Sequence, residues 1–280
     1  MDAVTTLTLS EFKREGRKIT ALTAYDAPFA RIMDRAGVDV ILVGDSVGMT
    51  VLGRADTLSV TLDEMIHHAR SVVSAVERAL VVVDMPFMSF QVSVEKAVEN
   101  AGRLIKETGA KAVKLEGDKG VEKTVRAIVE AGIPVMGHVG LRPQSIHKFG
   151  GFKVQGRESG SAKRIELDAK ATENGGGFAV VIEAVPVSLA KQITESLNIP
   201  TIGIGAGMHC DGQILVMHDV LGISDNVRPR FAKRYASVAD IAQKAFREYI
   251  EEVKGGKFPT MQHSYSKLKL IKKSRASTGI

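Results

Sequence analysis

The sequence has 280 residues, of which 44% are hydrophobic and 25% are charged. This composition is ordinary for a globular protein and excludes a wholly disordered chain. The single cysteine, Cys210, excludes an intrachain disulfide and a zinc site built from several thiolates. No secretory signal or membrane-length apolar run is present, so we expect a cytoplasmic protein without a membrane partner.

The formal net charge of +6 is concentrated in residues 263–280, which hold five basic residues and no acidic one. The rest of the chain is therefore nearly neutral, and we interpret 263–280 as a flexible basic tail. One alternative function is a nucleic-acid-binding protein that uses this tail and the segment RPRFAKR at 228–234. Aromatic residues for base stacking are sparse in both segments, so we expect no nucleic-acid partner.

Short aliphatic runs typical of buried strands recur along the chain. There are eight, at residues 18–26, 38–46, 79–86, 110–117, 133–140, 178–186, 200–207 and 213–222. Helical patterns lie between most of them. In residues 61–79 a Thr61–Glu64 capping box precedes apolar residues at helical spacing, and in 93–109 a helical period ends at Gly109.

Strands rich in valine and isoleucine that alternate with helices predict a parallel sheet covered on both faces. With eight strands, the favoured fold is an α/β protein, a (β/α)8 TIM barrel, in a single domain over residues 1–262. A doubly wound nucleotide-binding sheet would need a GxGxxG turn after its first strand, and TAYDAPFAR stands there instead. The glycine-rich, basic stretch 140–164 is either a mobile connection over the barrel mouth, or a fixed Ω-loop or subunit contact.

In such a barrel the chemistry lies at the carboxyl ends of the strands. Most of the predicted strands here end in polar residues: Asp45 and Ser46, Asp84, Lys114 and Glu116, His138, and Glu183. Because side chains alternate along a strand, Lys114 and Glu116 share one face, which we expect to point into the mouth.

Four carboxylates would then face one lysine. Buried charge without a partner is costly, so these groups must be protonated or share a cation. Oxygen ligands on separate strands favour Mg²⁺, with Mn²⁺ or Co²⁺ as substitutes.

Each residue taken singly also has a plain structural interpretation. An aspartate after a strand often caps a helix, a Lys–Glu pair can be a surface salt bridge, and His138 can be a hydrogen-bonded structural histidine. GIGAG at 203–207 lacks dinucleotide spacing; it can bind an anion or can simply permit tight packing. The prediction of an active site therefore depends on these strand-end residues all lying together at the barrel mouth.

Several segments closely resemble the ketopantoate hydroxymethyltransferase family. They include TAYDAPFAR, ILVGDSVGMTVLG, VVVDMPFMSF, AVKLEG, GHVGLRPQS, VIEAVP and GIGAGMHCDGQILVMHD, and together they span about residues 5–260. The resemblance implies a metal-dependent barrel of the phosphoenolpyruvate/pyruvate group. It also implies transfer of a hydroxymethyl group from 5,10-methylenetetrahydrofolate to 3-methyl-2-oxobutanoate, through a Mg-stabilised enolate, in pantothenate and coenzyme A biosynthesis.

The resemblance also implies site roles and assembly. Asp45, Asp84 and Glu116 fall where the family binds Mg²⁺, and Asp45, Ser46, Asp84 and Lys114 where it holds the oxo acid. Glu183 falls where it places the proton acceptor, and we expect His138 to support it. Family members are large homo-oligomers, often decamers.

An alternative within the same fold is a Mg-dependent lyase or aldolase that acts on another 2-oxo acid without folate. Such enzymes often use a reactive cysteine in a loop after a middle strand. The only cysteine here, Cys210, comes late and near GIGAG.

Overall fold

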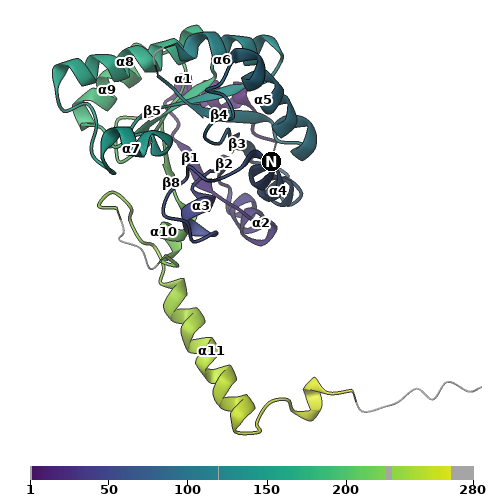
Figure 1. Cartoon of the computed structure of the whole chain (residues 1–280). Coiled ribbons are helices and arrows are strands. Elements are labelled where there is room, and N and C mark those ends of the chain that lie inside the picture. The colour runs from purple at the N-terminus through teal and green to yellow at the C-terminus, as the bar shows by residue number, and fades with distance from the viewer. Residues whose placement is uncertain (1, 119, 225–228, 266–280) are drawn as a thin grey trace, which may run out of the picture.

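A computed structural model describes residues 2–118, 120–224 and 229–265. Eight parallel strands close into a barrel in chain order, with β1 paired to β8 (Figure 1). The strands are β1 (Ile19–Thr23), β2 (Val40–Val43), β3 (Leu80–Asp84), β4 (Ala112–Glu116), β5 (Val135–Gly140), β6 (Ala179–Glu183), β7 (Thr201–Ile204) and β8 (Gly212–Leu215). The predicted TIM barrel is confirmed, and each of the eight predicted runs contains a strand. The last run, 213–222, was predicted too long, because its second half forms a helix, Met217–Leu221.

Helices follow most of the strands and form the outer layer (Figure 1). The α-helices are α1 (Thr6–Glu15), α2 (Ala27–Ala36), α3 (Val47–Thr50), α4 (Leu62–Val73), α5 (Val94–Thr108), α6 (Val121–Glu130), α7 (Ile146–Phe149), α8 (Ser159–Asn174), α9 (Val187–Ser196), α10 (Met217–Leu221) and α11 (Val238–Lys254). Two short 3₁₀ turns are η1 (Pro143–Ser145) and η2 (Met261–His263). The predicted capping box at Thr61 and the left-handed Gly109 at the end of α5 are both present.

The regular alternation breaks at three places. The helix predicted over 61–79 ends at Val73, because residues 74–79 turn toward β3. No helix lies between β7 and β8, where the GIGAG loop connects them directly. A side chain at Gly205 or Gly207 in that loop would collide with Phe231 or Val187, so close packing accounts for these two glycines. The third break is the stretch 140–164, described with the site below.

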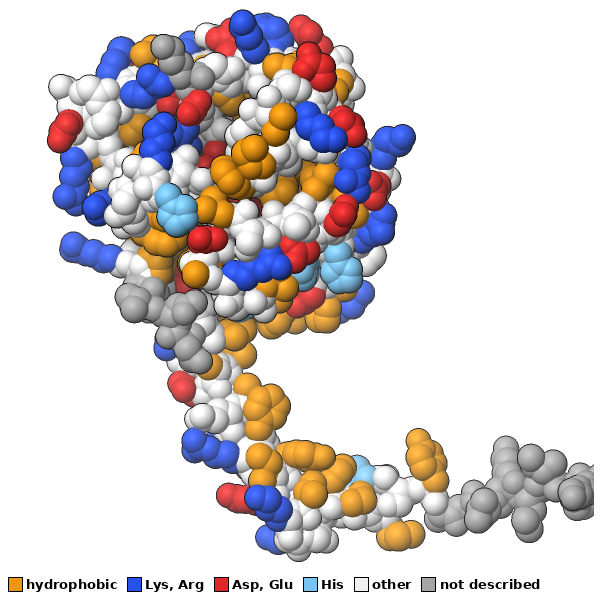
Figure 2. Space-filling model, in the orientation of Figure 1, with side chains coloured by type: hydrophobic (Ala, Val, Ile, Leu, Met, Phe, Trp, Pro, Cys, Tyr) orange, Lys and Arg blue, Asp and Glu red, His pale blue; other side chains and the backbone are white. Residues whose placement is uncertain are grey.

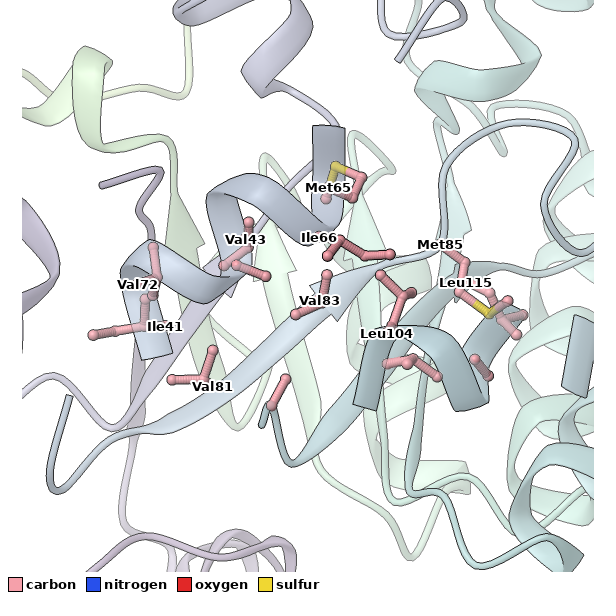
Figure 3. Close-up of a cluster of buried hydrophobic side chains, with 14 of the residues drawn as sticks. Ile41, Val43, Met65, Ile66, Val72, Val81, Val83, Met85, Leu104 and Leu115 are labelled. Atoms are coloured by element: carbon pink, nitrogen blue, oxygen red, sulfur yellow. The ribbon is translucent and has the colours of Figure 1, made fainter. Parts of the chain in front are cut away.

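The strand residues alternate between two hydrophobic layers. Outward-facing residues pack against the helices, and Figure 3 shows Val81 and Val83 of β3 in one cluster with Met65 of α4 and Leu104 of α5. The inward-facing residues fill the barrel, among them Leu80, Val82, Ala112, Met136 and Val181. The parallel strands are therefore buried on both faces, as their aliphatic sequences predict.

Helix α1 covers the end of the barrel at which the strands begin. Its Leu9 and Phe12 belong to the same cluster as the inward-facing strand residues. Lys13 forms an ion pair of 2.8 Å with Asp211, the residue before β8. Helix α1 thus covers the barrel interior at the end where the strands begin.

Helix α11 leads away from the barrel (Figure 1). None of its residues is buried. The predicted basic tail lies, from residue 266 onward, outside the described residues. Within the described ranges, no helix is both long and apolar enough to cross a membrane.

Candidate active site

Strand alternation sends the predicted site residues into the barrel. Leu80 and Val82 face inward, so Asp84 at the end of β3 does as well. The same counting places Lys114 and Glu116 after Ala112, His138 after Met136, and Glu183 after Val181. By contrast Val113 and Leu115 lie in the outer cluster with the helices, as predicted. A two-residue period thus brings charged side chains from neighbouring strands to one mouth.

The end of β2 contributes Asp45 and Ser46. The backbone N–H of Asp45 donates to Oδ2 of Asp84 at 3.1 Å, which joins the ends of β2 and β3. The hydroxyl groups of Ser46 and Tyr25 are 2.7 Å apart. Gly44 allows this approach, because a Cβ there would lie 2.8 Å from Oγ of Ser46 and 3.4 Å from Oδ2 of Asp84.

A chain of close polar contacts runs from β3 to β6. Nζ of Lys114 lies 2.7 Å from Oδ1 of Asp84 and 3.3 Å from Nδ1 of His138. Nε2 of His138 lies 3.0 Å from Oε2 of Glu183, although this pair is not aligned as a hydrogen bond in the present conformation. Side chains from four adjacent strands are therefore in contact in sequence.

The charge states along this chain follow from burial. Burial and then the charge of Lys114 hold the pKa of His138 well below its usual range, so the imidazole is neutral. Burial alone would lower the pKa of Lys114, but the charges of Asp84 and Asp45 raise it above its usual value. Because an ammonium group can only donate, we assign Nδ1 of His138 as acceptor and place its proton on Nε2, facing Glu183.

Three carboxyl groups at the mouth have raised pKa values. Burial, followed by the charge of Asp84, raises the pKa of Asp45 to about 7. Burial and the charge of Asp45 raise the pKa of Glu116 well above its usual value. Burial raises the pKa of Glu183 to about 7, against the opposing effect of Lys114. As predicted, more carboxyl groups than lysines lie at the mouth, and Lys114 offsets only part of the cost of ionising them.

Gln144 was not predicted as a site residue, yet it lies between two of these carboxylates. Its backbone N–H donates to Oε1 of Glu116 at 3.0 Å, and its side-chain Nε2 donates to Oδ2 of Asp45 at 2.9 Å. The residue lies in the stretch 140–164, for which a mobile connection and a fixed loop were both considered. Residues 143–149 instead form η1 and α7, and Arg142, Gln144 and Ile146 are buried at the mouth. The only sequence signal was the position of this segment directly after β5.

The oxygens at the mouth suit a hard divalent cation, although no three His, Cys, Asp or Glu side chains of the described residues are close enough to hold a metal as they stand. Gln144 binds one oxygen each of Asp45 and Glu116, and among the described residues no donor binds Oδ1 of Asp45 or Oε2 of Glu116. Within the same residues, Oδ1 of Asp84 is paired with the Lys114 ammonium and accepts no other hydrogen bond. Carboxylate oxygens with a free lone pair are the hard ligands that Mg²⁺ prefers.

A cavity of about 410 Å³ opens beside Glu116 and Gln144. Its walls come from the loop after β3, with Phe87 and Phe90, and from Thr124 of α6 and Arg142. The mixture of aromatic and polar walls is typical of small-molecule sites. Cys210 lies at the other end of the barrel, where it is buried and burial raises the pKa of its thiol, so it cannot act as a base at this mouth.

A closed (β/α)8 barrel whose strand ends carry acidic side chains defines a class of enzyme fold. One solved structure of this class is phosphonopyruvate hydrolase in complex with oxalate and Mg²⁺, with a TM-score of 0.60, 12% identity and coverage of 93% of both chains. Another is 2,3-dimethylmalate lyase, a member of the PEP mutase/isocitrate lyase superfamily, with a TM-score of 0.56, 16% identity and coverage of 96% of this chain and 91% of the other. At these identities the likeness establishes the fold alone.

The family follows from sequence. The profile of ketopantoate hydroxymethyltransferase matches residues 3–261. The 3-methyl-2-oxobutanoate hydroxymethyltransferase of Thermoanaerobacter sp. (strain X514) is 56% identical over 265 residues, which are 95% of this chain and 97% of that protein. The enzyme of the same name from Syntrophotalea carbinolica is 55% identical over 262 residues, 94% of this chain and 98% of that protein. The chain belongs to the ketopantoate hydroxymethyltransferase family, and the resemblance identified from its motifs is confirmed.

Proposed function

We propose that this protein transfers a hydroxymethyl group from 5,10-methylenetetrahydrofolate to 3-methyl-2-oxobutanoate, forming 2-dehydropantoate and tetrahydrofolate in the cytoplasm. The observation that carries the proposal is the match to relatives of that name over nearly the whole chain. The geometry supports it, because the mouth combines a cluster of carboxyl groups, the buried ammonium group of Lys114 and the separate carboxyl group of Glu183. A carbon acid whose anion must be stabilised needs these three groups.

We assign Asp45, Asp84 and Glu116 as the residues that hold Mg²⁺, with Asp45 and Asp84 also close to the oxo acid. Their support is the excess of buried negative charge and the free oxygens of Asp45 and Glu116. Bound Mg²⁺ would supply Lewis-acid stabilisation of the negative charge that develops when the oxo acid is deprotonated.

Lys114 and Ser46 are proposed to bind the oxo acid. Lys114 remains an ammonium inside the mouth, where water screens its charge little, so it attracts the carboxylate and the developing enolate oxygen. Ser46 lies next to Asp45 and carries a hydroxyl already oriented by Tyr25.

Glu183 is proposed to remove the proton from C3 of the oxo acid. Its pKa of about 7 keeps an appreciable ionised fraction at neutral pH and makes it a stronger base than an ordinary carboxylate. His138, neutral and with its proton on Nε2, lies 3.0 Å from the Glu183 carboxylate. Its proposed support of the ionised form requires a small rotation that aligns this N–H with the carboxylate. The carbon nucleophile then forms a bond to the methylene carbon of the folate, and the two bonds from that carbon to the folate nitrogens break. Water supplies the hydroxyl group and the proton for one nitrogen, and the proton taken up by Glu183 goes to the other, which releases tetrahydrofolate.

We also propose that the protein is a homo-oligomer, in line with the decamer that the resemblance implies. Helix α11 supports this, because Figure 2 shows hydrophobic side chains along the helix that projects from the body of the molecule. The exposed residues include Ile241, Phe246, Tyr249, Ile250 and Val253. Such an apolar face on a helix without buried residues is stable in water only when something covers it.

The direct test is production of 2-dehydropantoate from the oxo acid and methylenetetrahydrofolate, with and without a chelator. We expect product only when folate and a divalent cation are both present. Product formation in excess chelator would reject the metal assignment. Failure to form product with Mg²⁺, Mn²⁺ or Co²⁺ would reject the proposed reaction.

A further inference from the structure

Gln144 forms hydrogen bonds at the barrel mouth through its backbone N–H and through both polar atoms of its side chain. Its backbone N–H and its Nε2 bind the carboxylates of Glu116 and Asp45. Nε2 also donates to the carbonyl oxygen of Met85 at 2.9 Å, and Oε1 accepts from Nε2 of Gln91 at 3.1 Å. One residue from the loop after β5 thus connects the ends of β2 and β3 through its side chain and the end of β4 through its backbone N–H.

These bonds fix the direction of two carboxylates. A terminal carboxylate torsion is otherwise broad, so a side chain alone does not determine which oxygen points where. With Oδ2 of Asp45 and Oε1 of Glu116 each bound by an N–H of Gln144, the other oxygen of each group is left for another ligand. The N–H donors also favour the ionised form, which is the form that binds a cation.

Only a glutamine meets all of these demands at this position. Its Nε2 must donate to a carboxylate while its Oε1 accepts from Gln91, so a residue with acceptors alone loses the bond to Asp45. A glutamate would add a further negative charge to a cluster that already has an excess. An asparagine is one methylene shorter, and the residue is only 7% exposed, so there is little room for compensating movement.

We infer that Gln144 is a positioning residue, which orients Asp45 and Glu116 so that their free oxygens bind the same divalent cation. The inference rests on the proposed function, because it takes those two carboxylates as metal ligands. It goes beyond that proposal in assigning part of the affinity for the ion to a neutral residue from a different loop. Donors that orient metal ligands typically account for roughly 10- to 100-fold in metal affinity.

The test measures Mn²⁺ binding directly, by the loss of the free-ion signal in electron paramagnetic resonance, without oxo acid or folate. Gln144→Met keeps the length and volume of the side chain and removes both side-chain donors. We expect its dissociation constant for Mn²⁺ to rise about 10- to 100-fold. Gln144→Asn, which keeps the amide but shortens its reach, should change affinity in the same direction and is the second variant if Gln144→Met does not fold.

The matched control is Gln213→Met, because the amide of Gln213 also donates to a backbone carbonyl, that of Gly207 at 2.9 Å, on an exposed part of the barrel. This variant should bind Mn²⁺ as the wild type does. Circular dichroism and thermal melting confirm that each variant is folded at the temperature of the titration. A Gln144 variant that melts earlier but binds Mn²⁺ within twofold of the wild type would overturn the inference, since its role would then be purely structural. If the wild-type protein binds Mn²⁺ but forms no 2-dehydropantoate, the proposed function fails while the inference stands.

Discussion

The rate of C3 proton removal should follow the ionisation of Glu183. In the presence of Mg²⁺ and without folate, the half-reaction is exchange of the C3 hydrogen of 3-methyl-2-oxobutanoate with deuterium from the solvent. Burial raises the pKa of Glu183 to about 7 in the metal-free protein, and a nearby cation would lower it toward its ordinary value. We therefore expect a midpoint at or below about 7, and above that of a solvent-exposed glutamate.

The size of the pH effect follows from this midpoint. For a midpoint in the upper part of this range, between about 6 and 7, the carboxyl group is roughly 1–10% ionised at pH 5 and 90–99% ionised at pH 8, so the exchange rate should rise at least about tenfold. An ordinary glutamate is already mostly ionised at pH 5 and gives a change below about twofold. Proton NMR in D₂O, at saturating Mg²⁺ and low oxo-acid concentration, reports kcat/KM for the free enzyme at each pH.

Glu183→Gln removes the base and should slow exchange by about 10²- to 10⁴-fold, the usual contribution of a positioned general base. Glu130→Gln is the matched control, since Glu130 is exposed at the end of α6, away from the mouth. Either of two results would refute the assignment: exchange at the wild-type rate in Glu183→Gln, or a rate that does not change between pH 5 and 8.

Three further predictions concern Asp45, Lys114 and α11. Asp45→Asn should stabilise the metal-free protein at pH 8. Because the folded-state pKa of Asp45 is raised by about three units, the free energy of unfolding falls as the pH rises from about 4 to 7. Removing the charge should therefore restore up to about 4 kcal/mol. Urea unfolding in chelator checks this, and an unchanged midpoint of unfolding would contradict it. Lys114→Met should raise the KM for the oxo acid by about 30-fold or more, because a buried charge partner is lost; steady-state kinetics with an unaltered KM would remove Lys114 from the substrate site. Phe246→Asp on α11 should reduce the molar mass measured by light scattering, whereas an unchanged mass would exclude this face from the subunit contact.

The barrel could be predicted from sequence because its strands carry an unambiguous pattern. Aliphatic runs such as VILV and LVVVD are buried on both faces, and a two-residue period then determines that Asp84, Lys114 and Glu116 face inward. The predicted runs 200–207 and 213–222 leave too few residues between them for a helix, in agreement with the direct connection of β7 and β8. The glycines there did not show how tightly this connection packs. The amphipathic pattern of α11 likewise does not specify what its apolar face contacts.

The failure to predict Gln144 from sequence has a physical reason. Gln144 reaches Asp45, which is 99 positions earlier in the chain, and this contact depends on the path of an irregular loop. No periodicity governs the direction of a side chain in such a loop, and a glutamine by itself carries no chemical signal. The roles assigned to the site residues stay predictions, whereas the contacts among Asp84, Lys114, His138 and Glu183 are features of the fold.

Closure of the ring pairs Ile19–Leu22 of β1 with Gly212–Leu215 of β8. One edge of β1, the first strand to be synthesised, therefore stays unpaired until β8 has been made. Every shorter nascent chain has two unpaired sheet edges. Unpaired edges invite association with other chains, and pairing over so long a sequence separation is slow. A premature stop before Gly212 should for this reason yield an aggregating product rather than a smaller folded one, and the span from β1 to β8 sets the shortest length of chain that can complete the barrel.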